Sequence, residues 1–182
     1  MSSHSTRRQL HRYPNKFFVE SGTYIGDGVA EALQCGFQVI KSFEIFPALA
    51  QQCQNRFLGV PNVEVILGSS SKLLFEHIKD MDGNITFWLD GHYSNTGTGY
   101  DPDNICPLLL ELEQIKLHPI KTHTIMIDDR RLLIPSTNGG MDGMFDISEE
   151  QVVKKLLEIN PNYKIRYEDG CEPNDIIIAY IA

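Results

Sequence analysis

The sequence predicts one α/β domain with a mostly parallel sheet of seven strands and helices on both faces, a Rossmann-like architecture. Short apolar runs alternate five times with amphipathic stretches along residues 15–182, as strand–helix units of a parallel sheet do. Two further apolar runs close the chain without a helical stretch between them, so they should pair as an antiparallel hairpin. The length of 182 residues fits a single domain with one sizeable core.

The first half of the domain contains three strand–helix units. Strands are expected at residues 17–20, 39–44 and 63–67, which are short apolar runs. Helices are expected at residues 26–35, 46–57 and 70–79. Pro47 falls in the first turn of the second helix, where its missing N–H costs nothing.

The second half contains two more units and the hairpin. Strands are expected at residues 85–89, 123–127, 164–167 and 176–181, and helices at residues 107–117 and 148–159. Ser148 and Gln151 form a capping box at the start of the last helix, and Pro161 follows its end. Residues 1–14 are expected to be a flexible leader, and Trp88 a core residue of its strand.

Composition excludes several classes of partner. The net charge of -8 argues against nucleic acid, because a phosphate backbone is held by clustered Lys and Arg. No apolar run approaches the roughly 18 residues that a membrane-spanning helix needs. The scattered cysteines suit neither a zinc site nor a disulfide scaffold, so a reduced, cytoplasmic location is expected; they are Cys35, Cys53, Cys106 and Cys171. A homodimer stays open.

Parallel sheets bind ligands beyond the carboxyl ends of their strands, so the residues that follow each strand are the informative ones. The first strand runs into the pattern Glu20-x-Gly22-x-x-x-Gly26, in which glycine lets a ligand approach the backbone. The dinucleotide fingerprint GxGxxG is absent, because Tyr24 stands at its second glycine. A carboxylate here favours a cationic ligand such as S-adenosylmethionine over a pyrophosphate, although a plain tight turn stays open.

The next two strands also end in polar residues. Glu44 could accept both hydroxyls of a ribose, or could be a solvated acid at a strand end. Gly68, Ser69 and Ser70 could face the edge of an adenine, or could cap the following helix.

Three carboxylates follow the strands at residues 85–89 and 123–127. Asp90, Asp128 and Asp129 would repel one another at one rim unless a cation lay among them. Oxygen ligands suit Mg²⁺, Mn²⁺ or Ca²⁺. Two alternatives stay open: an acid that caps a turn, and neutralisation by Arg130 or Arg131.

These strand ends together resemble the class I S-adenosylmethionine-dependent methyltransferases, over roughly residues 15–182. The resemblance implies a cofactor site made of Glu20, Ser21, Gly22, Thr23, Tyr24, Gly26, Glu44, Gly68, Ser69, Ser70 and Asp90. Within it, Glu20 and Gly22 would line the methionine part, Glu44 the ribose and Ser69 the adenine. The family usually has Asp at the position of Ser69, to accept from the adenine amino group, and a serine hydroxyl is a weaker acceptor.

The second half of the site resembles the metal-dependent O-methyltransferases of the catechol type and the sugar-modifying macrocin type. Asp90, Asp128 and Asp129 match their metal positions, and the Asp-Asp pair favours the sugar-modifying branch. The lysine base of the catechol type falls near Tyr93 or Ser94, so that base is not retained.

His92 is the candidate base beside Asp90, because its unperturbed pKa of about 6.5 suits proton removal near neutral pH. A purely structural role for His92 stays open, and such a role is expected for His123 at the opposite edge of the sheet. Two Gly-rich loops, residues 93–104 and 133–146, should form an acceptor pocket that is mobile without ligand. Tyr93, Tyr100 and Arg130 are the expected acceptor contacts. Asp101-x-Asp103 only faintly resembles a calcium loop.

The sequence therefore predicts an O-methyltransferase that uses S-adenosylmethionine and Mg²⁺, or Mn²⁺ or Ca²⁺, to methylate a sugar or glycan hydroxyl. A small phenol or catechol is the alternative acceptor. Two other classes stay open: an NAD-dependent oxidoreductase or epimerase, which the missing GxGxxG disfavours, and a non-catalytic cofactor-binding module, which the three acids disfavour.

Overall fold

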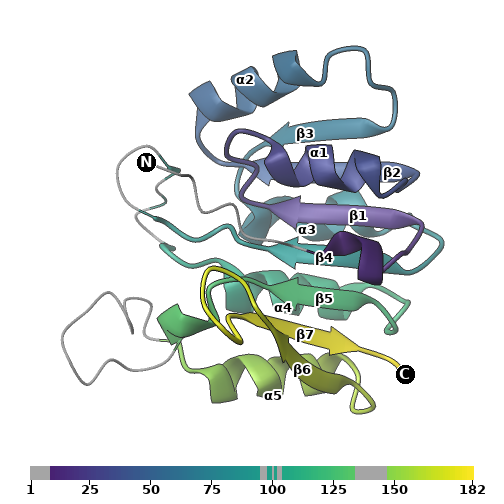
Figure 1. The fold of residues 1–182 in the computed structure, drawn as a ribbon, viewed down its shortest axis with the longest axis vertical. Helices are drawn as coiled ribbons and strands as arrows, with labels where there is room; N and C mark the ends of the chain where they lie inside the picture. Colours follow the sequence, from purple (N-terminus) through teal and green to yellow (C-terminus); the bar gives the residue numbers. More distant parts are fainter. Residues whose placement is uncertain (1–8, 95–97, 100, 102–103, 134–146) are drawn as a thin grey trace.

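The computed structural model describes residues 9–94, 98–99, 101, 104–133 and 147–182. Seven strands of this described part form one sheet in the order β3-β2-β1-β4-β5-β7-β6 (Figure 1). They are β1 (Phe17–Ser21), β2 (Val39–Glu44), β3 (Val63–Leu67), β4 (Ile85–Leu89), β5 (Thr124–Ile127), β6 (Lys164–Glu168) and β7 (Ile176–Tyr180). β1 to β5 are parallel, and β7 is antiparallel to both β5 and β6, which confirms the predicted sheet and hairpin.

Helices cover both faces of the sheet. They are α1 (Asp27–Gln34), α2 (Pro47–Arg56), α3 (Ser70–Ile78), α4 (Leu108–Leu117) and α5 (Glu149–Ile159), with short 3-10 turns η1 (Leu10–Arg12) and η2 (Arg130–Leu133). The predicted capping box of α5 is present, with Gln151 N donating to Ser148 Oγ at 3.2 Å and Ser148 N to Gln151 Oε1 at 2.7 Å.

The core has two layers because alternate strand residues point to opposite faces. Phe18 and Trp88 pack with residues of α1 and α2 on one face, which confirms Trp88 as a core residue. Val19 and Phe87 pack on the other face with residues of α3, α4 and α5.

Part of the expected leader packs against the domain. Leu10 and Tyr13 are buried, and the Tyr13 hydroxyl donates to the Glu168 carboxylate at the end of β6. Residues 1–8 lie outside the described residues. Within the described part, no helix combines the length and the apolar character that a bilayer crossing requires.

Strands β1 to β5 all end at one edge of the sheet, which we call the carboxyl edge. The backbone bonds of the sheet continue beyond the strands there, because Asp90 N donates to Ser21 O at 3.2 Å and Asp128 N donates to Leu89 O at 3.2 Å. Gly68 N donates to Glu44 O at 2.8 Å in the same way. The residues that follow each strand are therefore held in fixed register along this edge.

Candidate active site

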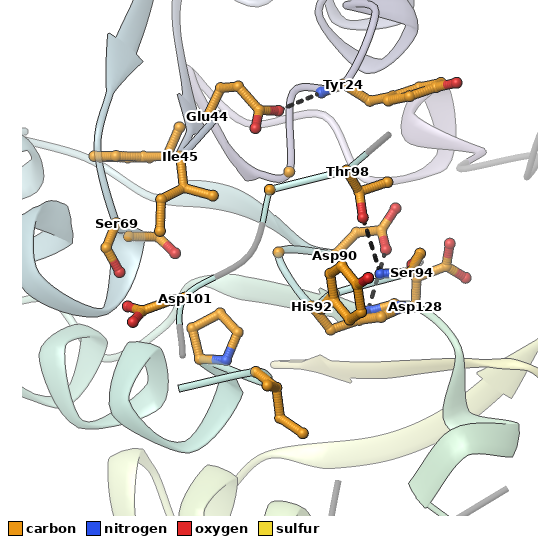
Figure 2. A pocket seen from close by; sticks show the side chains of 18 of the residues that line it. Tyr24, Glu44, Ile45, Ser69, Asp90, His92, Ser94, Thr98, Asp101 and Asp128 are labelled. Atoms are coloured by element: carbon orange, nitrogen blue, oxygen red, sulfur yellow. Dashed lines mark hydrogen bonds and ion pairs between the residues drawn. The ribbon is translucent and has the colours of Figure 1, made fainter. Parts of the chain in front are cut away.

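A cavity of about 360 Å³ opens at the carboxyl edge (Figure 2). Its volume lies in the range of small-molecule and cofactor sites. Its polar lining includes Gly22, Tyr24, Glu44, Gly68, Ser69, Ser70, Asp90, His92, Tyr93, Asp101, Asp128, Asp129 and Arg131. The strand ends that the sequence singled out thus share one cavity.

Gly22 brings two strand ends into close contact. Its φ of 82° is a conformation that L side chains rarely adopt, and a Cβ there would lie 2.2 Å from the carbonyl oxygen of Asp90. No other residue fits this position without moving the backbone. Asp90 follows β4 and Gly22 follows β1, so the turn of the first strand rests directly on the first acid of the cavity.

Glu44 is held by backbone groups. Its side chain accepts from Tyr24 N at 2.8 Å and from Phe46 N at 2.9 Å, and the residue is only 4% exposed. Burial raises the pKa of Glu44, while those backbone hydrogen bonds oppose the rise. The predicted ribose-binding acid is therefore oriented before any ligand arrives.

Four of the predicted cofactor residues lie outside the cavity lining of the described structure. Glu20 is fully buried and accepts from Ser42 Oγ at 2.7 Å, and Ser42 Oγ lies 2.6 Å from Thr23 Oγ1. Ser21 lies beneath Asp90, with Asp90 N 3.3 Å from Ser21 Oγ. Their hydrogen bonds connect the end of β1 and the turn after it with Ser42 of β2 and with Asp90 after β4.

Gly26 is the fourth such residue and has a packing role. A Cβ at Gly26 would lie 2.7 Å from the ring of Phe57, so this glycine lets the start of α1 approach that ring.

Ser69 and Ser70 line the cavity at the start of α3. The Ser69 hydroxyl lies 2.8 Å from Ser71 Oγ, and Ser70 Oγ donates to Glu111. Glu111 is buried in α4, and burial raises its pKa against the hydrogen bonds from Ser70 and Ser21. The sequence analysis missed Glu111; the available signal was an acid on the apolar face of a predicted helix.

His92 lies between two of the predicted metal ligands. Its Nε2 is 2.9 Å from Asp129 Oδ2, and its Nδ1 is 3.5 Å from Asp90 Oδ1. Burial lowers the pKa of His92, but the contact with Asp129 and the charges of Asp90 and Asp128 outweigh burial and raise it. Burial also acts on Asp129, yet His92 and Arg131 hold its pKa below the usual range.

Asp128 is the most strongly perturbed acid of the group. It is buried, and its Oδ1 has no hydrogen-bond partner among the described residues. Burial, together with the charges of Asp90 and Asp129, raises its pKa well above the usual range. Asp129 beside it has a positive φ of 57°, a conformation that Asp tolerates better than most residues and that occurs often at functional sites.

Arg131 and Arg130 differ in their surroundings. Arg131 contacts Asp129 at 2.5 Å and also pairs with the buried Asp175, so it neutralises part of the acidic group. Arg130 lies outside the cavity lining, because its Nε pairs with Glu149 at 2.8 Å and its guanidinium stacks over Tyr167. Asp175 was missed in the sequence, where it ends the turn before the last strand.

The donor set fits a divalent cation. One ligand atom each from Asp90, His92 and Asp129 lies within 4.8 Å of the others, and the same holds for Asp128, Asp129 and Asp175. Carboxylate oxygens are the ligands of Mg²⁺ and Mn²⁺, and the buried Asp128 oxygen without a hydrogen bond is available to such an ion.

The connection between β4 and α4 contributes the outer wall of the cavity through its described residues. Its ends are joined by Tyr93 N, which donates to Ile105 O at 2.9 Å, and Ser94 N lies 3.1 Å from Thr98 Oγ1. Tyr100 and most of residues 133–146 lie outside the described residues, so their predicted part in the acceptor pocket is untested. The mobility of both loops stays a prediction.

Comparison with known families gives no match for this sequence, and comparison with curated proteins gives none either. Solved structures do share the fold. An O-methyltransferase of Bacillus cereus in complex with SAH has a TM-score of 0.64 at 14% identity, over 100% of this chain and 84% of its own. An SAH-bound Podospora anserina methyltransferase has a TM-score of 0.62 at 13% identity, over 95% and 74%. An Aquifex aeolicus SAM-dependent methyltransferase has a TM-score of 0.59 at 16% identity, over 92% and 82%. The structural neighbours are class I methyltransferases, and at such low identity they establish the fold alone.

Proposed function

We propose that this chain is an S-adenosylmethionine-dependent O-methyltransferase that uses a divalent cation, preferably Mg²⁺, and methylates a hydroxyl of a sugar or glycan. One observation carries the proposal: Glu44 and the acidic cluster open onto the same cavity (Figure 2). By acidic cluster we mean Asp90, His92, Asp128 and Asp129.

The cofactor half of the proposal rests on Glu44 and Gly22. The Glu44 carboxylate is fixed by two backbone N–H groups and still lines the cavity, so it can accept from the two hydroxyls of a ribose. Gly22 lines the same cavity, so its backbone can meet the amino-acid part of the cofactor. S-adenosylmethionine, when bound, supplies a methyl group on a cationic sulfur, and the acids of this cavity favour a cation.

The acidic cluster supports the second half of the proposal, which is metal-assisted transfer to a hydroxyl. Asp90 and Asp129 would hold the cation, with His92 as a third ligand or as the base; Asp128 belongs with Asp129 and Asp175 to a second possible ligand set. A bound divalent cation supplies positive charge that lowers the pKa of a nearby hydroxyl. As the base, His92 accepts the proton of the acceptor hydroxyl, and Asp90 and Asp129 stabilise the resulting imidazolium.

The acceptor is proposed from the chemistry of the outer wall. Ser94, Thr98 and Asn104 offer hydroxyl and amide groups, which suit a polyhydroxyl acceptor. The net charge of -8 disfavours nucleic acid. A small-molecule or glycan acceptor and a cytoplasmic location are parts of the same proposal, and a phenol or catechol is the second acceptor class to test.

Methyl transfer from labelled S-adenosylmethionine to a panel of sugars and catechols, with Mg²⁺ or with a chelator, tests the proposal. We expect transfer to a sugar hydroxyl that the chelator abolishes. Methyl transfer that a chelator leaves unchanged would refute the requirement for a divalent cation. Methyl transfer to catechols alone would refute the sugar as the acceptor. Glu150→Gln changes an exposed acid of α5 that is not part of the cavity lining, so it should transfer methyl groups as the wild type does.

A further inference from the structure

The cavity has two chemically different ends (Figure 2). Asp90, His92 and Asp128 gather at one end, whereas Ser69 and Asp101 lie at the other. In the proposed function the methyl group has to reach the acidic cluster. Because the ribose separates the base of the cofactor from its methionine part, the base belongs at the end that holds Ser69 and Asp101.

Asp101 comes from the connection between β4 and α4, yet it lies against the start of α3. Its Oδ2 is 3.9 Å from Lys72 Nζ, and Lys72 is one turn into the helix, where its backbone N donates to Ser69 O at 3.1 Å. The Asp101 side chain is only 12% exposed, although it belongs to a surface connection. Asn104 N donates to Asp101 O at 3.0 Å, which fixes the turn that carries it.

Gly99 explains how this connection comes so close to the cavity. A Cβ at Gly99 would lie 2.0 Å from Ile45 Cγ2 and 3.3 Å from Glu44 Oε1, so the backbone there lies directly on the residues that follow β2. Asp101 is two residues further on and lines the same cavity.

The walls at this end suit a flat ring with a polar edge. Ile45 lies at this end and contributes apolar surface, and Phe43 and Leu49 also belong to the cavity lining. The polar groups beside them are the Ser69 hydroxyl, which is already within hydrogen-bond distance of Ser71 Oγ, and the Asp101 carboxylate. A carboxylate accepts hydrogen bonds from an amino group about twice as strongly as a neutral group does.

We propose that the Asp101 carboxylate accepts a hydrogen bond from the 6-amino group of the adenine of S-adenosylmethionine. This assignment rests on the proposed function. The acceptor that Ser69 provides only weakly is then supplied by Asp101, from a different part of the chain.

The assignment predicts a defined chemical selectivity. A carboxylate repels the 6-oxo group of hypoxanthine, whereas it accepts from the 6-amino group of adenine. An asparagine at this position offers both a donor and an acceptor, so it should tolerate either base.

Titration calorimetry with S-adenosylhomocysteine and its deaminated analogue S-inosylhomocysteine tests the assignment. We expect the wild type to prefer the adenosyl compound by about tenfold to a hundredfold, as for a hydrogen bond to a charged group. Asp101→Asn should reduce that preference to below about threefold, and Asp101→Glu should restore part of it. Asp80→Asn, an exposed acid at the end of α3, should keep the wild-type preference.

Three outcomes overturn the idea in different ways. An unchanged preference in Asp101→Asn, with a wild-type circular dichroism spectrum, would show that Asp101 does not contact the base. An equal loss of preference in Lys72→Gln would show that Asp101 acts only as an ion-pair partner of that lysine. If the wild type binds neither compound, the proposed function fails and the assignment fails with it.

Discussion

Two histidines at opposite edges of one sheet have opposite surroundings. At the opposite edge, where β4 and β5 begin, His123 Nδ1 accepts from Ile85 N at 3.1 Å, and its Nε2 lies 3.0 Å from His118 Nδ1. His118 Nδ1 accepts from Ile120 N at 3.2 Å, so His123 Nε2 is the donor of that pair. His118 Nε2 then donates to Ile78 O at 3.1 Å. At the carboxyl edge, His92 instead faces the carboxylates of Asp90 and Asp129.

The comparison shows how the candidate functional site differs from a structural site in the same sheet. At the amino ends of the strands, each ring nitrogen of His118 and His123 has a hydrogen-bond partner, so nothing is left for a ligand. At the carboxyl edge, like charges crowd together and an oxygen of Asp128 has no hydrogen bond in the described part. Such an arrangement costs stability without a cation, which is typical of sites selected for binding.

The largest expected effect is the loss of turnover in Asp90→Asn. Removal of one carboxylate of the acidic cluster should lower Mg²⁺-dependent methyl transfer on the order of a thousandfold, because a cation contributes several kcal/mol to the transition state. The affinity for S-adenosylhomocysteine should change by less than about threefold. Activity assays and calorimetry on the same preparation check both values. Unchanged turnover in Asp90→Asn would contradict a catalytic role for the acidic cluster.

The paired variants His123→Ala and His92→Ala test the comparison directly. His123→Ala leaves the buried Ile85 N–H and His118 without their partner, so the free energy of unfolding should fall by about 2–4 kcal/mol. Turnover per folded molecule should stay near the wild-type value. His92→Ala should show the reverse, with lost turnover and a change in unfolding free energy below about 1 kcal/mol. Urea denaturation measures the stability, and a large stability loss in both variants would contradict the distinction.

The pH dependence of stability should report His123. Burial, with the nearby charges of His118 and Lys121, lowers the pKa of His123 to about 3, against about 6.5 in the unfolded chain. The unfolded state therefore binds the proton first, and stability that is full above pH 6.5 is lost as the pH falls towards 3. Between pH 7 and pH 5 the loss should be about 2 kcal/mol.

Urea midpoints of the wild type and of His123→Asn at both pH values isolate this contribution. Between pH 7 and pH 5, the unfolding free energy of His123→Asn should fall less than that of the wild type, because the variant lacks the group that titrates. Equal slopes in the two proteins would mean that His123 does not titrate as described.

The smallest expected effect concerns a residue that acts through another. Asp175 pairs with Arg131, which contacts Asp129, so Asp175→Asn should shift the position of Asp129. We expect the Mg²⁺ concentration at half-maximal activity to rise about tenfold, as for other partners of metal ligands. The activity at saturating Mg²⁺ should recover, and a loss that saturating Mg²⁺ does not restore would assign Asp175 a different role.

Most of the fold could be predicted from the sequence because local patterns determine it. Strand β2 ends at Glu44 and β3 covers residues 63–67 as expected, since a short apolar run ends where polar residues begin. The acids that follow parallel strands were brought to one edge by topology alone, which is why Glu44, Asp90 and Asp128 share a cavity.

The side chains that were missed depend on contacts between distant segments. Asp175 meets Arg131 across 44 positions, and Glu111 meets Ser70 across 41, so no periodicity reveals either pair. Glu20 was expected to face the ligand. In the structure Glu20 is buried instead. Alternate strand residues share a face, so Glu20 lies on the same face of β1 as Phe18, which packs with residues of α1. The pairing of His118 with His123 likewise depends on how the ends of α3 and α4 pack.

The close approach of Gly22 to the Asp90 carbonyl has a consequence for how this protein can change over evolutionary time. The turn that would receive the donor and the strand that carries the first acid are in backbone contact, so a mutation at position 22 displaces both at once. New acceptor preferences should therefore arise through the connection between β4 and α4, whose side chains can vary while that contact stays intact.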